Sequence, residues 1–246
     1  MVDSLLKISH HGAVTGVTGS CHELHLDTEN SVLIDCGLFQ GAETSPNGSR
    51  FEQLKIDFPI STVRALIVTH CHIDHVGRIP YLIAAGFSGK IYCSEPTAEL
   101  LPLVLEDAIK IGFTKDKVLV EKFLALLNSR VVALSYKQWY TIPLAHTRHL
   151  LKVKMKPAGH ILGSAYVECR FSQQRIVFSG DLGASHTPLL PSPKAPYAAD
   201  ILVLESTYGD KNHEHRQDRR RQLKHIIEKC FTNSGVILIP AFSIGR

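Results

Sequence analysis

The chain has 246 residues, of which 44% are apolar and 20% charged, and its formal net charge at pH 7 is +4. This composition is typical of a globular protein with a substantial core, and the small net charge tolerates a polyanionic ligand without arguing for one. No apolar stretch reaches transmembrane length, and the first twelve residues lack the apolar region of a signal peptide. We therefore expect a soluble, cytoplasmic protein that does not enter a membrane.

Short apolar runs bounded by Gly, Ser, Asp or Pro recur along the chain, and they predict strands buried on both faces. In chain order these runs are residues 31–37 (SVLIDCG), 65–70 (ALIVTH), 89–94 (GKIYCS), 175–181 (RIVFSGD), 201–206 (ILVLES) and 235–242 (GVILIPAF). Between residues 150 and 178, apolar residues alternate with polar ones. That period of two predicts half-exposed strands, with a hairpin turn at SQQ.

Helical periodicity fills the gaps between these strands. It predicts a helix over residues 75–87, a helical zone over 94–130 that breaks near IGFTKD, and an amphipathic helix over 215–231. Four prolines predict a loop over residues 184–200. The mixture of strands and helices indicates a layered α/β protein.

Six cysteines are spread along the chain, and none belongs to a C-x-x-C pair. They are Cys21, Cys36, Cys71, Cys93, Cys169 and Cys230. A chain of this length can build its core without disulfides, so we expect free thiols in a reducing compartment.

Four of the predicted strands end on an ionisable residue. These residues are Asp35, His70, Asp181 and Glu205. Sites in layered α/β folds assemble at the carboxyl ends of strands. One such residue can simply mark a strand end, but four of them predict a common cleft.

The densest group of metal-seeking side chains is H-x-H-x-D-H at residues 70–75. His70 and His72 lie two residues apart, so both can bind one ion, whereas Asp74 and His75 favour a second ion. Imidazole and carboxylate ligands without thiolate suit zinc, with manganese or iron as rivals. Closed structural zinc sites favour cysteine, so this set indicates a catalytic centre.

Two ions need further ligands from elsewhere in the chain. His160 lies in PAGHILGSAY, where flanking glycines allow a close backbone approach, and Asp181 lies in FSGDLG. Taken alone, each is more often an ordinary core or turn residue. A pair of ions about 3.5–4 Å apart, however, requires a bridging carboxylate.

These motifs together resemble a known fold. T-H-x-H-x-D-H-V-G, with DCG before it and GHILGSA and SGDLG after it, resembles the metallo-β-lactamase fold. LVLESTYGDKNHEHR, followed by VILIPAFSIGR, is similar to its β-CASP branch of RNA-processing nucleases. The resemblance implies an αββα sandwich, incomplete here, over residues 1–208, and the start of an inserted β-CASP α/β domain over 209–246. Because the last run reads as a strand that still needs a covering element, we expect a truncated chain.

The resemblance also implies a role for each site residue. Two zinc ions are expected, with His70, His72 and His160 on one, Asp74 and His75 on the other, and Asp181 bridging them. Asp35 is expected to orient the histidines, and Glu205 to organise the site without being a principal ligand. Asp74 and Asp181 are the candidates to hold the attacking water. Two histidines of the family pattern have no counterpart in this chain.

The implied activity is metal-assisted hydrolysis of phosphodiester bonds in single-stranded RNA. RNA is preferred to DNA because of the family branch, and weak or no activity is expected from this chain alone. Two alternatives stay open, a small-molecule hydrolase acting on thioesters or lactones and a non-catalytic scaffold subunit. The oligomeric state is also open, with a homodimer as one option.

Overall fold

The computed structural model describes residues 6–41, 55–112, 114–185, 187–212, 218–242 and 244–245. The chain divides into two compact units, residues 1–205 and 206–246. Each unit is described by itself below.

The first sheet of the larger unit has six strands in the order β1-β2-β3-β4-β5-β6. The strands are β1 (Lys7–Gly12), β2 (Cys21–His25), β3 (Ser31–Ile34), β4 (Val63–Ile67), β5 (Lys90–Ser94) and β6 (Val131–Leu134). Strands β1 to β3 pair antiparallel, and β3 to β6 pair parallel. The carboxyl ends of β3 and β4 therefore lie at the same edge of the sheet.

The second sheet has five strands in the order β11-β10-β9-β8-β7. They are β7 (Trp139–Ile142), β8 (Leu151–Pro157), β9 (Ala165–Phe171), β10 (Gln174–Phe178) and β11 (Ile201–Val203). All pairs are antiparallel except β10 with β11. Alternate residues such as Val153 and Val167 are fully buried in the core between the two sheets, as the period of two predicts.

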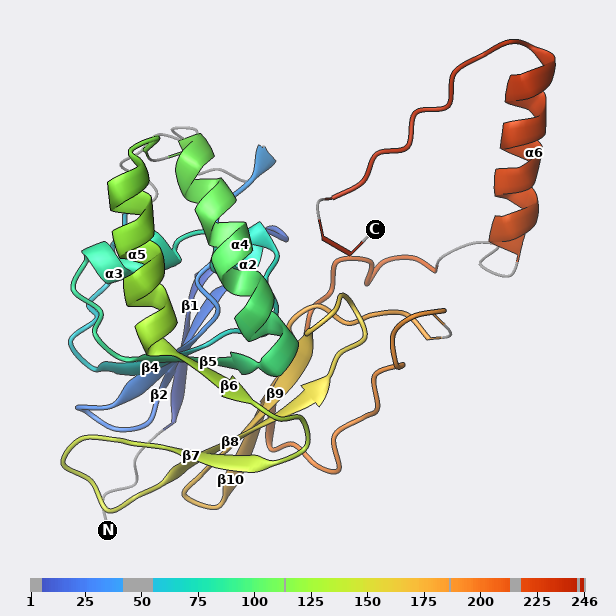
Figure 1. The fold of residues 1–246 in the computed structure, drawn as a ribbon. Helices are drawn as coiled ribbons and strands as arrows, with labels where there is room; N and C mark the ends of the chain where they lie inside the picture. The colour runs from blue at the N-terminus through green and yellow to red at the C-terminus, as the bar shows by residue number, and fades with distance from the viewer. Residues whose placement is uncertain are drawn as a thin grey trace. The chain divides into compact units, whose positions relative to one another are not determined.

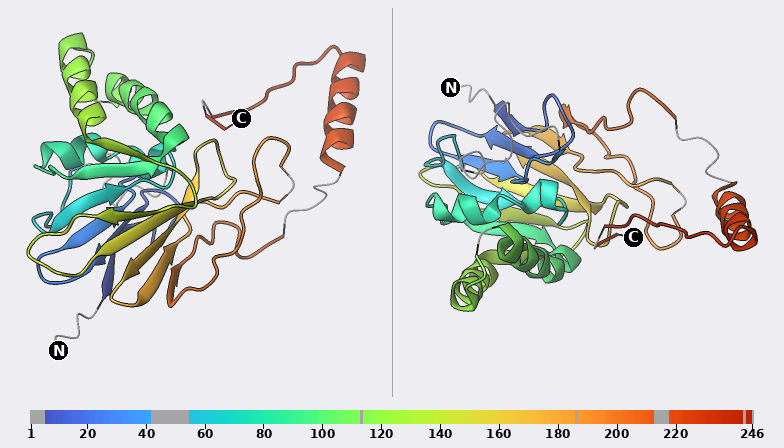
Figure 2. Two further views of the ribbon diagram at one scale, coloured as in Figure 1. Left: turned by 60° about the horizontal axis from the view of Figure 1, so that its bottom comes forward. Right: turned by 90° about the horizontal axis from the view of Figure 1, so that it is seen from above.

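Among the described residues, helices cover one side of this sandwich. They are α2 (Ile73–Val76), α3 (Ile79–Ala84), α4 (Glu95–Gly112) and α5 (Lys117–Arg130). Figure 1 and Figure 2 show α3, α4 and α5 over the first sheet, with the second sheet on the opposite side. The expected α/β fold class is confirmed. The described residues of this unit supply three of the four layers of an αββα sandwich, namely one layer of helices and the two sheets. None of the described helices combines the length and apolar character needed to cross a bilayer.

Several element boundaries differ from those that the sequence predicts. The helix expected over 75–87 is split into α2 and α3, because Pro80 near the start of α3 has no N–H with which to continue a helix from α2. The long helical zone breaks before α5, where Asp116 accepts hydrogen bonds from the N–H groups of Val118 and Leu119. The short strands β1, β2, β6 and β7 were not predicted.

The smaller unit contains helix α6 (Arg219–Thr232). The helix predicted over 215–231 starts within residues 213–217, which lie outside the described part of the chain. The strand predicted over 235–242 is not formed, and Val236 and Leu238 are 84% and 86% exposed. A strand needs a partner for its backbone groups, and the described residues of this unit provide none.

Candidate metal centre

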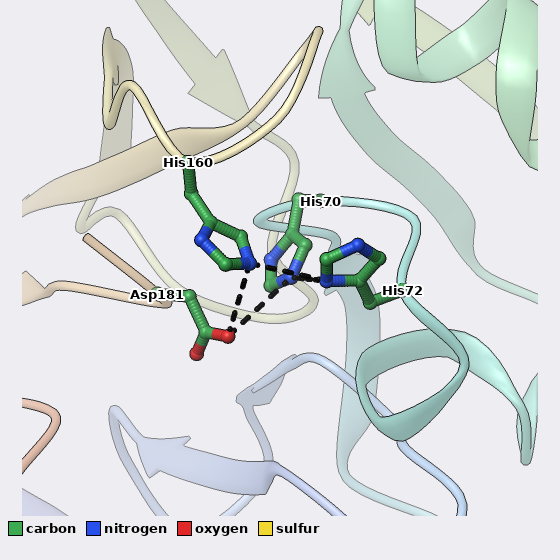
Figure 3. Close-up of side chains that lie close together, drawn as sticks. All are labelled: His70, His72, His160 and Asp181. Atoms are coloured by element: carbon green, nitrogen blue, oxygen red, sulfur yellow. Dashed lines mark hydrogen bonds and ion pairs between the residues drawn. The ribbon is translucent and has the colours of Figure 1, made fainter. Parts of the chain in front are cut away.

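Four metal-ligating side chains converge at one end of the sandwich. His70 and His72 follow β4, His160 follows β8 and Asp181 follows β10. One donor atom from each lies within 4.8 Å of all the others. Figure 3 shows the three imidazole rings and the carboxylate turned toward one another from separate loops.

The spacing of these donor atoms fits a single cation. His72 Nδ1 lies 3.2 Å from His70 Nε2 and 3.1 Å from His160 Nε2. Asp181 Oδ2 lies 3.4 Å from His160 Nε2 and 3.8 Å from His70 Nε2. Neighbouring ligands of a tetrahedral zinc, with bonds of about 2.0–2.1 Å, lie about 3.3–3.4 Å apart. His72 Nδ1 cannot share one proton with both His70 Nε2 and His160 Nε2 at once. A cation bound by these nitrogens therefore satisfies the arrangement better than hydrogen bonds do.

A second group of donors lies on the other side of the Asp181 carboxylate. His75 Nε2 is 3.2 Å from Asp181 Oδ1 and 3.9 Å from Asp74 Oδ2. This nitrogen is buried and forms no regular hydrogen bond with the described residues. The two oxygens of Asp181 thus face different histidines, which is the arrangement that a carboxylate between two cations requires.

Asp35 holds His75 in place from within the protein. The carboxylate is 1% exposed, and its Oδ2 lies 2.7 Å from His75 Nδ1, which must donate to it. Thr69 donates to the same carboxylate from its N–H and its hydroxyl, both at 2.8 Å. The Thr69 hydroxyl oxygen is also 3.1 Å from His70 Nδ1. Asp35 therefore directs His75 Nε2 toward the centre, as carboxylates do for metal-binding histidines.

Thr69 is a residue of the centre for which the sequence predicted no role. The only feature of the sequence that pointed to it was its place directly before the H-x-H-x-D-H motif. Its side chain links Asp35 to the first histidine, and this link depends on how β3 and β4 pair.

Two glycines allow the loops of the centre to approach closely. A Cβ on Gly37 would lie 1.6 Å from the carbonyl oxygen of Asp74, and one on Gly183 would lie 1.7 Å from that of Gly159. Next to Gly37, the N–H of Cys36 donates to the carbonyl of His75 at 2.8 Å. The DCG and SGDLG motifs therefore need glycine because other residues would push these loops apart.

Burial and neighbouring charges shift the pKa values of the centre in directions that favour cation binding. Burial lowers the pKa of His70 well below its usual value and also lowers that of His160. Burial alone would raise the pKa of Asp181, but its contact with His75 outweighs burial and lowers it. For His75, burial is outweighed by two carboxylates, which raise its pKa well above the usual value. Neutral imidazoles and an ionised carboxylate are the forms that bind a metal, and a cation can replace the proton held at His75.

Glu205 contacts the loop that carries Asp181 without joining the cluster of donors. Its Oε1 accepts a hydrogen bond from the N–H of Leu182 at 2.9 Å, and its own N–H donates to Ser179 Oγ at 2.9 Å. These bonds fix the residues on both sides of Asp181. The structure therefore brings all four strand-end residues, Asp35, His70, Asp181 and Glu205, to one end of the sandwich.

Cysteine does not contribute to this group of donors. Cys71, inside the motif, is 1% exposed, and burial raises its pKa to about 11. All six cysteines are free, as expected.

Comparison with known proteins places this geometry in context. The family model described as the metallo-beta-lactamase superfamily matches residues 14–224. The match confirms the resemblance that the motifs indicate. Members of this family that act as nucleases bind divalent metal ions, in agreement with the cluster of histidines and aspartates.

Curated relatives match nearly the whole chain. Ribonuclease TTHA0252 of Thermus thermophilus is 36% identical over 98% of this chain and 53% of its own length. Transcription termination factor FttA of Methanothermobacter thermautotrophicus is 32% identical over 98% of this chain and 38% of its length. Endoribonuclease ysh1 of Schizosaccharomyces pombe is 30% identical over 98% of this chain and 31% of its length. The chain thus spans about half of the first relative and about a third of the other two.

Proposed function

Because the chain belongs to the metallo-β-lactamase superfamily, we propose that it is a zinc-dependent hydrolase that cleaves phosphodiester bonds in single-stranded RNA. The observation that carries this proposal is the convergence of two groups of donor atoms on opposite oxygens of Asp181. RNA is proposed because relatives in the β-CASP branch are named as a ribonuclease and an endoribonuclease.

Two ions are proposed, each with its own protein ligands. His70, His72 and His160 would hold the first, Asp74 and His75 would hold the second, and Asp181 would contribute a carboxylate oxygen to each. Zinc is proposed for both positions because the donors are imidazole nitrogens and carboxylate oxygens, with no thiolate. When bound, such ions lower the pKa of water toward 7 and neutralise charge on phosphoryl oxygens.

The chain's own residues prepare the site for this chemistry. Asp35 and Thr69 fix the orientation of His75, so no reorganisation is needed when substrate binds. The side chain of Asp74 is 20% exposed and lies beside His75. We assign Asp74 and Asp181 to accept hydrogen bonds from the attacking water, and Glu205 to hold the loop of Asp181.

The proposed domain boundaries follow the family resemblance. We assign residues 1–208 to the metallo-β-lactamase domain, because they contain every proposed ligand. Residues 209–246 are assigned to the β-CASP portion.

The proposal is tested with the full chain in metal-free and zinc-loaded forms. A 5′-labelled single-stranded RNA is one substrate, and a bis-aryl phosphodiester is a second that needs no extended RNA-binding surface. A model thioester is assayed in parallel. We expect about two zinc ions per chain by elemental analysis and weak, zinc-dependent turnover of the phosphodiesters.

Two results would contradict the proposal. Turnover of the thioester without any phosphodiester cleavage would indicate a small-molecule hydrolase. Fewer than one zinc ion per chain, with no turnover of any substrate, would indicate a scaffold.

A further inference from the structure

The ring of His160 is held less directly than the rings of His70 and His75. Nδ1 of His75 donates to Asp35 at 2.7 Å, and Nδ1 of His70 lies 3.1 Å from the hydroxyl oxygen of Thr69. Nδ1 of His160, by contrast, forms no hydrogen bond with the described residues. The backbone that carries this ring must therefore set the position of its Nε2.

That backbone belongs to the loop between β8 and β9, residues 158–164, called the His160 loop below. Ser164, at the end of the loop, is 2% exposed. Its Oγ accepts hydrogen bonds from the N–H groups of His160 at 3.0 Å and of Ile161 at 3.2 Å. One buried hydroxyl thus binds the chain on both sides of the Cα atom from which the His160 ring projects.

The main chain of Ser164 closes the same loop. Its N–H donates to the carbonyl of Ile161 at 3.0 Å, and its carbonyl accepts from the N–H of Ala158 at 3.0 Å. These bonds keep the ends of the loop together whatever side chain stands at this position. The contribution of the hydroxyl can therefore be separated from loop closure by changing the side chain alone.

The His160 loop is also attached to the start of α4. The fully buried hydroxyls of Ser94 and Thr97 donate to the carbonyl of Gly163 at 2.5 Å and 2.9 Å. Gly163 has a φ of +85°, and a Cβ at this position would lie 2.5 Å from Thr97 Oγ1. Glycine is thus required for this close approach, and the loop has a second polar anchor outside itself.

These anchors act on only one of the two groups of donors. The His160 loop carries a single proposed ligand, whereas Asp74 and His75 lie on α2. The side chain of Ser164 bonds to the N–H groups within its own loop and makes no hydrogen bond with Asp74 or His75. A loss of this side chain should therefore disturb the first group of donors and spare the second.

We propose that Ser164 is a positioning residue for His160 and thereby sets the affinity of the first cation without affecting the second. The cations rest on the proposed function, whereas the hold on the His160 backbone rests on geometry alone. Without the hydroxyl, two N–H groups lose their acceptor and the loop relaxes. Nε2 of His160 then leaves its place 3.1 Å from His72 Nδ1.

The first test uses the metal-free full chain and needs no zinc. Amide hydrogen exchange followed by NMR resolves single N–H groups. In Ser164→Ala, the N–H groups of His160 and Ile161 should exchange about 10-fold faster or more than in wild type, because both have lost their acceptor. The N–H of Ala165, which donates to the carbonyl of Thr69 at 2.8 Å, should keep its rate.

The second test measures the affinity of each cation. Competition with a chelator gives the zinc affinities, and cadmium-113 NMR of the cadmium-loaded chain, with one signal for each bound cation, shows which site has changed. Ser164→Ala should weaken the first cation by about 10- to 100-fold, as for other residues that orient metal ligands. The affinity of the second cation should stay near that of wild type.

Ser31→Ala is the matched control, because it removes an equally buried hydroxyl elsewhere in the sandwich. Ser31 is 0% exposed, and its Oγ lies 3.1 Å from Thr62 Oγ1. It begins β3, whereas Asp35 directly follows the end of that strand. Both cation affinities and the exchange rates of the His160 loop should match those of wild type. Circular dichroism and melting curves check that each variant is folded.

Thr97→Val tests the second anchor with a side chain of nearly the same shape. It removes one of the two hydroxyls that donate to Gly163 and leaves that of Ser94 in place. The first cation should bind about threefold more weakly, in keeping with the net contribution of one hydrogen bond. The second cation should again be unaffected.

Three results would overturn the inference. Wild-type exchange of the His160 and Ile161 amides in Ser164→Ala would show that the hydroxyl does not hold the loop. Equal weakening of both cations would indicate a general loss of stability in place of a positioned ligand. A loss of the first cation in Ser31→Ala as large as in Ser164→Ala would have the same meaning.

The outcome is separate from that of the proposed function. Faster exchange of the two amides with selective loss of the first cation, but no phosphodiester cleavage by wild type, would support this inference and contradict the nuclease. Zinc-dependent cleavage by wild type, together with unchanged affinities in Ser164→Ala, would do the reverse.

Discussion

The larger unit contains two groups of four histidines, and only one of them has the geometry of a metal site. The metal centre is formed by His70, His72, His75 and His160 around Asp181. The second group, called the hairpin group below, is formed by His10, His11, His22 and His25 around Glu23 on β1 and β2. Both combine imidazoles with a buried or half-buried carboxylate, so composition alone does not distinguish them.

The hairpin group satisfies its histidines without bringing all four rings together. On one face of the strands, His11 Nε2 is 2.8 Å from Glu23 Oε2, and His25 Nδ1 is 3.5 Å from Glu23 Oε1. His25 Nε2 is 2.9 Å from Ser9 Oγ. His10 and His22 pair through their Nδ1 atoms at 2.8 Å on the other face of the strands. Because strand alternation divides the four rings between two faces, all four cannot converge on one point as the rings of the metal centre do.

The metal centre differs because its donors come from three separate segments of the chain. The loops after β4, β8 and β10 bring donor nitrogens as close together as the ligands of one cation would be. Asp35 fixes the ring of His75 by a hydrogen bond to its other nitrogen. Convergence of donors, and not the number of histidines, therefore distinguishes a metal site. The following predictions test that distinction.

The largest effect is expected from Asp181→Asn. Loss of the carboxylate charge between the two groups of donors should remove at least one zinc ion per chain and lower phosphodiester turnover by more than about 100-fold. Elemental analysis and a turnover assay on the bis-aryl phosphodiester measure both. Glu23→Gln makes the same chemical change in the hairpin group, and this variant should retain the zinc of the metal centre. Equal zinc loss in the two variants would contradict the distinction between the two groups of histidines.

A smaller effect is expected from Asp35→Asn. The amide can no longer serve as an anionic acceptor for both Thr69 and His75, so His75 loses its fixed orientation. Zinc affinity should fall by about 10- to 100-fold, as for other residues that orient metal ligands. Competition with a chelator measures this affinity. An unchanged affinity would show that the buried carboxylate serves folding alone.

The pH dependence of the free energy of unfolding should reveal the contribution of His22, a half-buried histidine of the hairpin group. Burial lowers the pKa of His22 to about 4 from an ordinary value of 6.5. The unfolded chain therefore takes up a proton first, and folding stability falls as pH drops from about 6.5 toward 4. Between pH 7 and pH 5 this group alone should account for about 2 kcal/mol.

Urea unfolding of metal-free wild type and His22→Leu at both pH values measures that contribution. The variant should lose less stability on acidification, by about 2 kcal/mol. Histidines that do not contact His22 are common to both proteins, so their contributions cancel. An equal loss in the two proteins would mean that His22 is as accessible to protons when folded as when unfolded.

The smallest effect is expected from His11→Gln. The introduced amide can still donate to Glu23, but the stacked contact of the imidazole ring with Phe58, with centroids 3.6 Å apart, is lost. The free energy of unfolding should fall by roughly 1 kcal/mol, with the zinc content unchanged. Zinc loss in this variant would show that the hairpin group also binds metal.

Much of the metal centre could be predicted from the sequence because its ligands occupy short, regular spacings and strand ends. H-x-H-x-D-H placed four donors within six residues, and the apolar runs before Asp35 and Asp181 indicated where strands would end. Thr69 could not be predicted, because its contacts depend on the pairing of β3 with β4. The row of cations formed by Lys152, Arg170 and Arg175 could not be predicted for a similar reason, since these residues meet only through the register of β8, β9 and β10.

The parts of the fold that were missed are those with weak local patterns. Strands β1 and β2 contain polar residues and histidines in place of a continuous apolar run. They are recognisable only when paired, because antiparallel hydrogen bonds and the neighbouring sheet stabilise them. The run at 235–242 shows the opposite case, in which an apolar pattern lacks a partner strand among the described residues of its unit.

Anomalous diffraction from zinc-loaded crystals, recorded at the zinc absorption edge, tests the central comparison most directly. Two peaks are expected on either side of the Asp181 carboxylate, one beside His70, His72 and His160 and one beside Asp74 and His75. No peak is expected between His11, Glu23 and His25. A peak in the hairpin group, or none beside Asp181, would contradict the account.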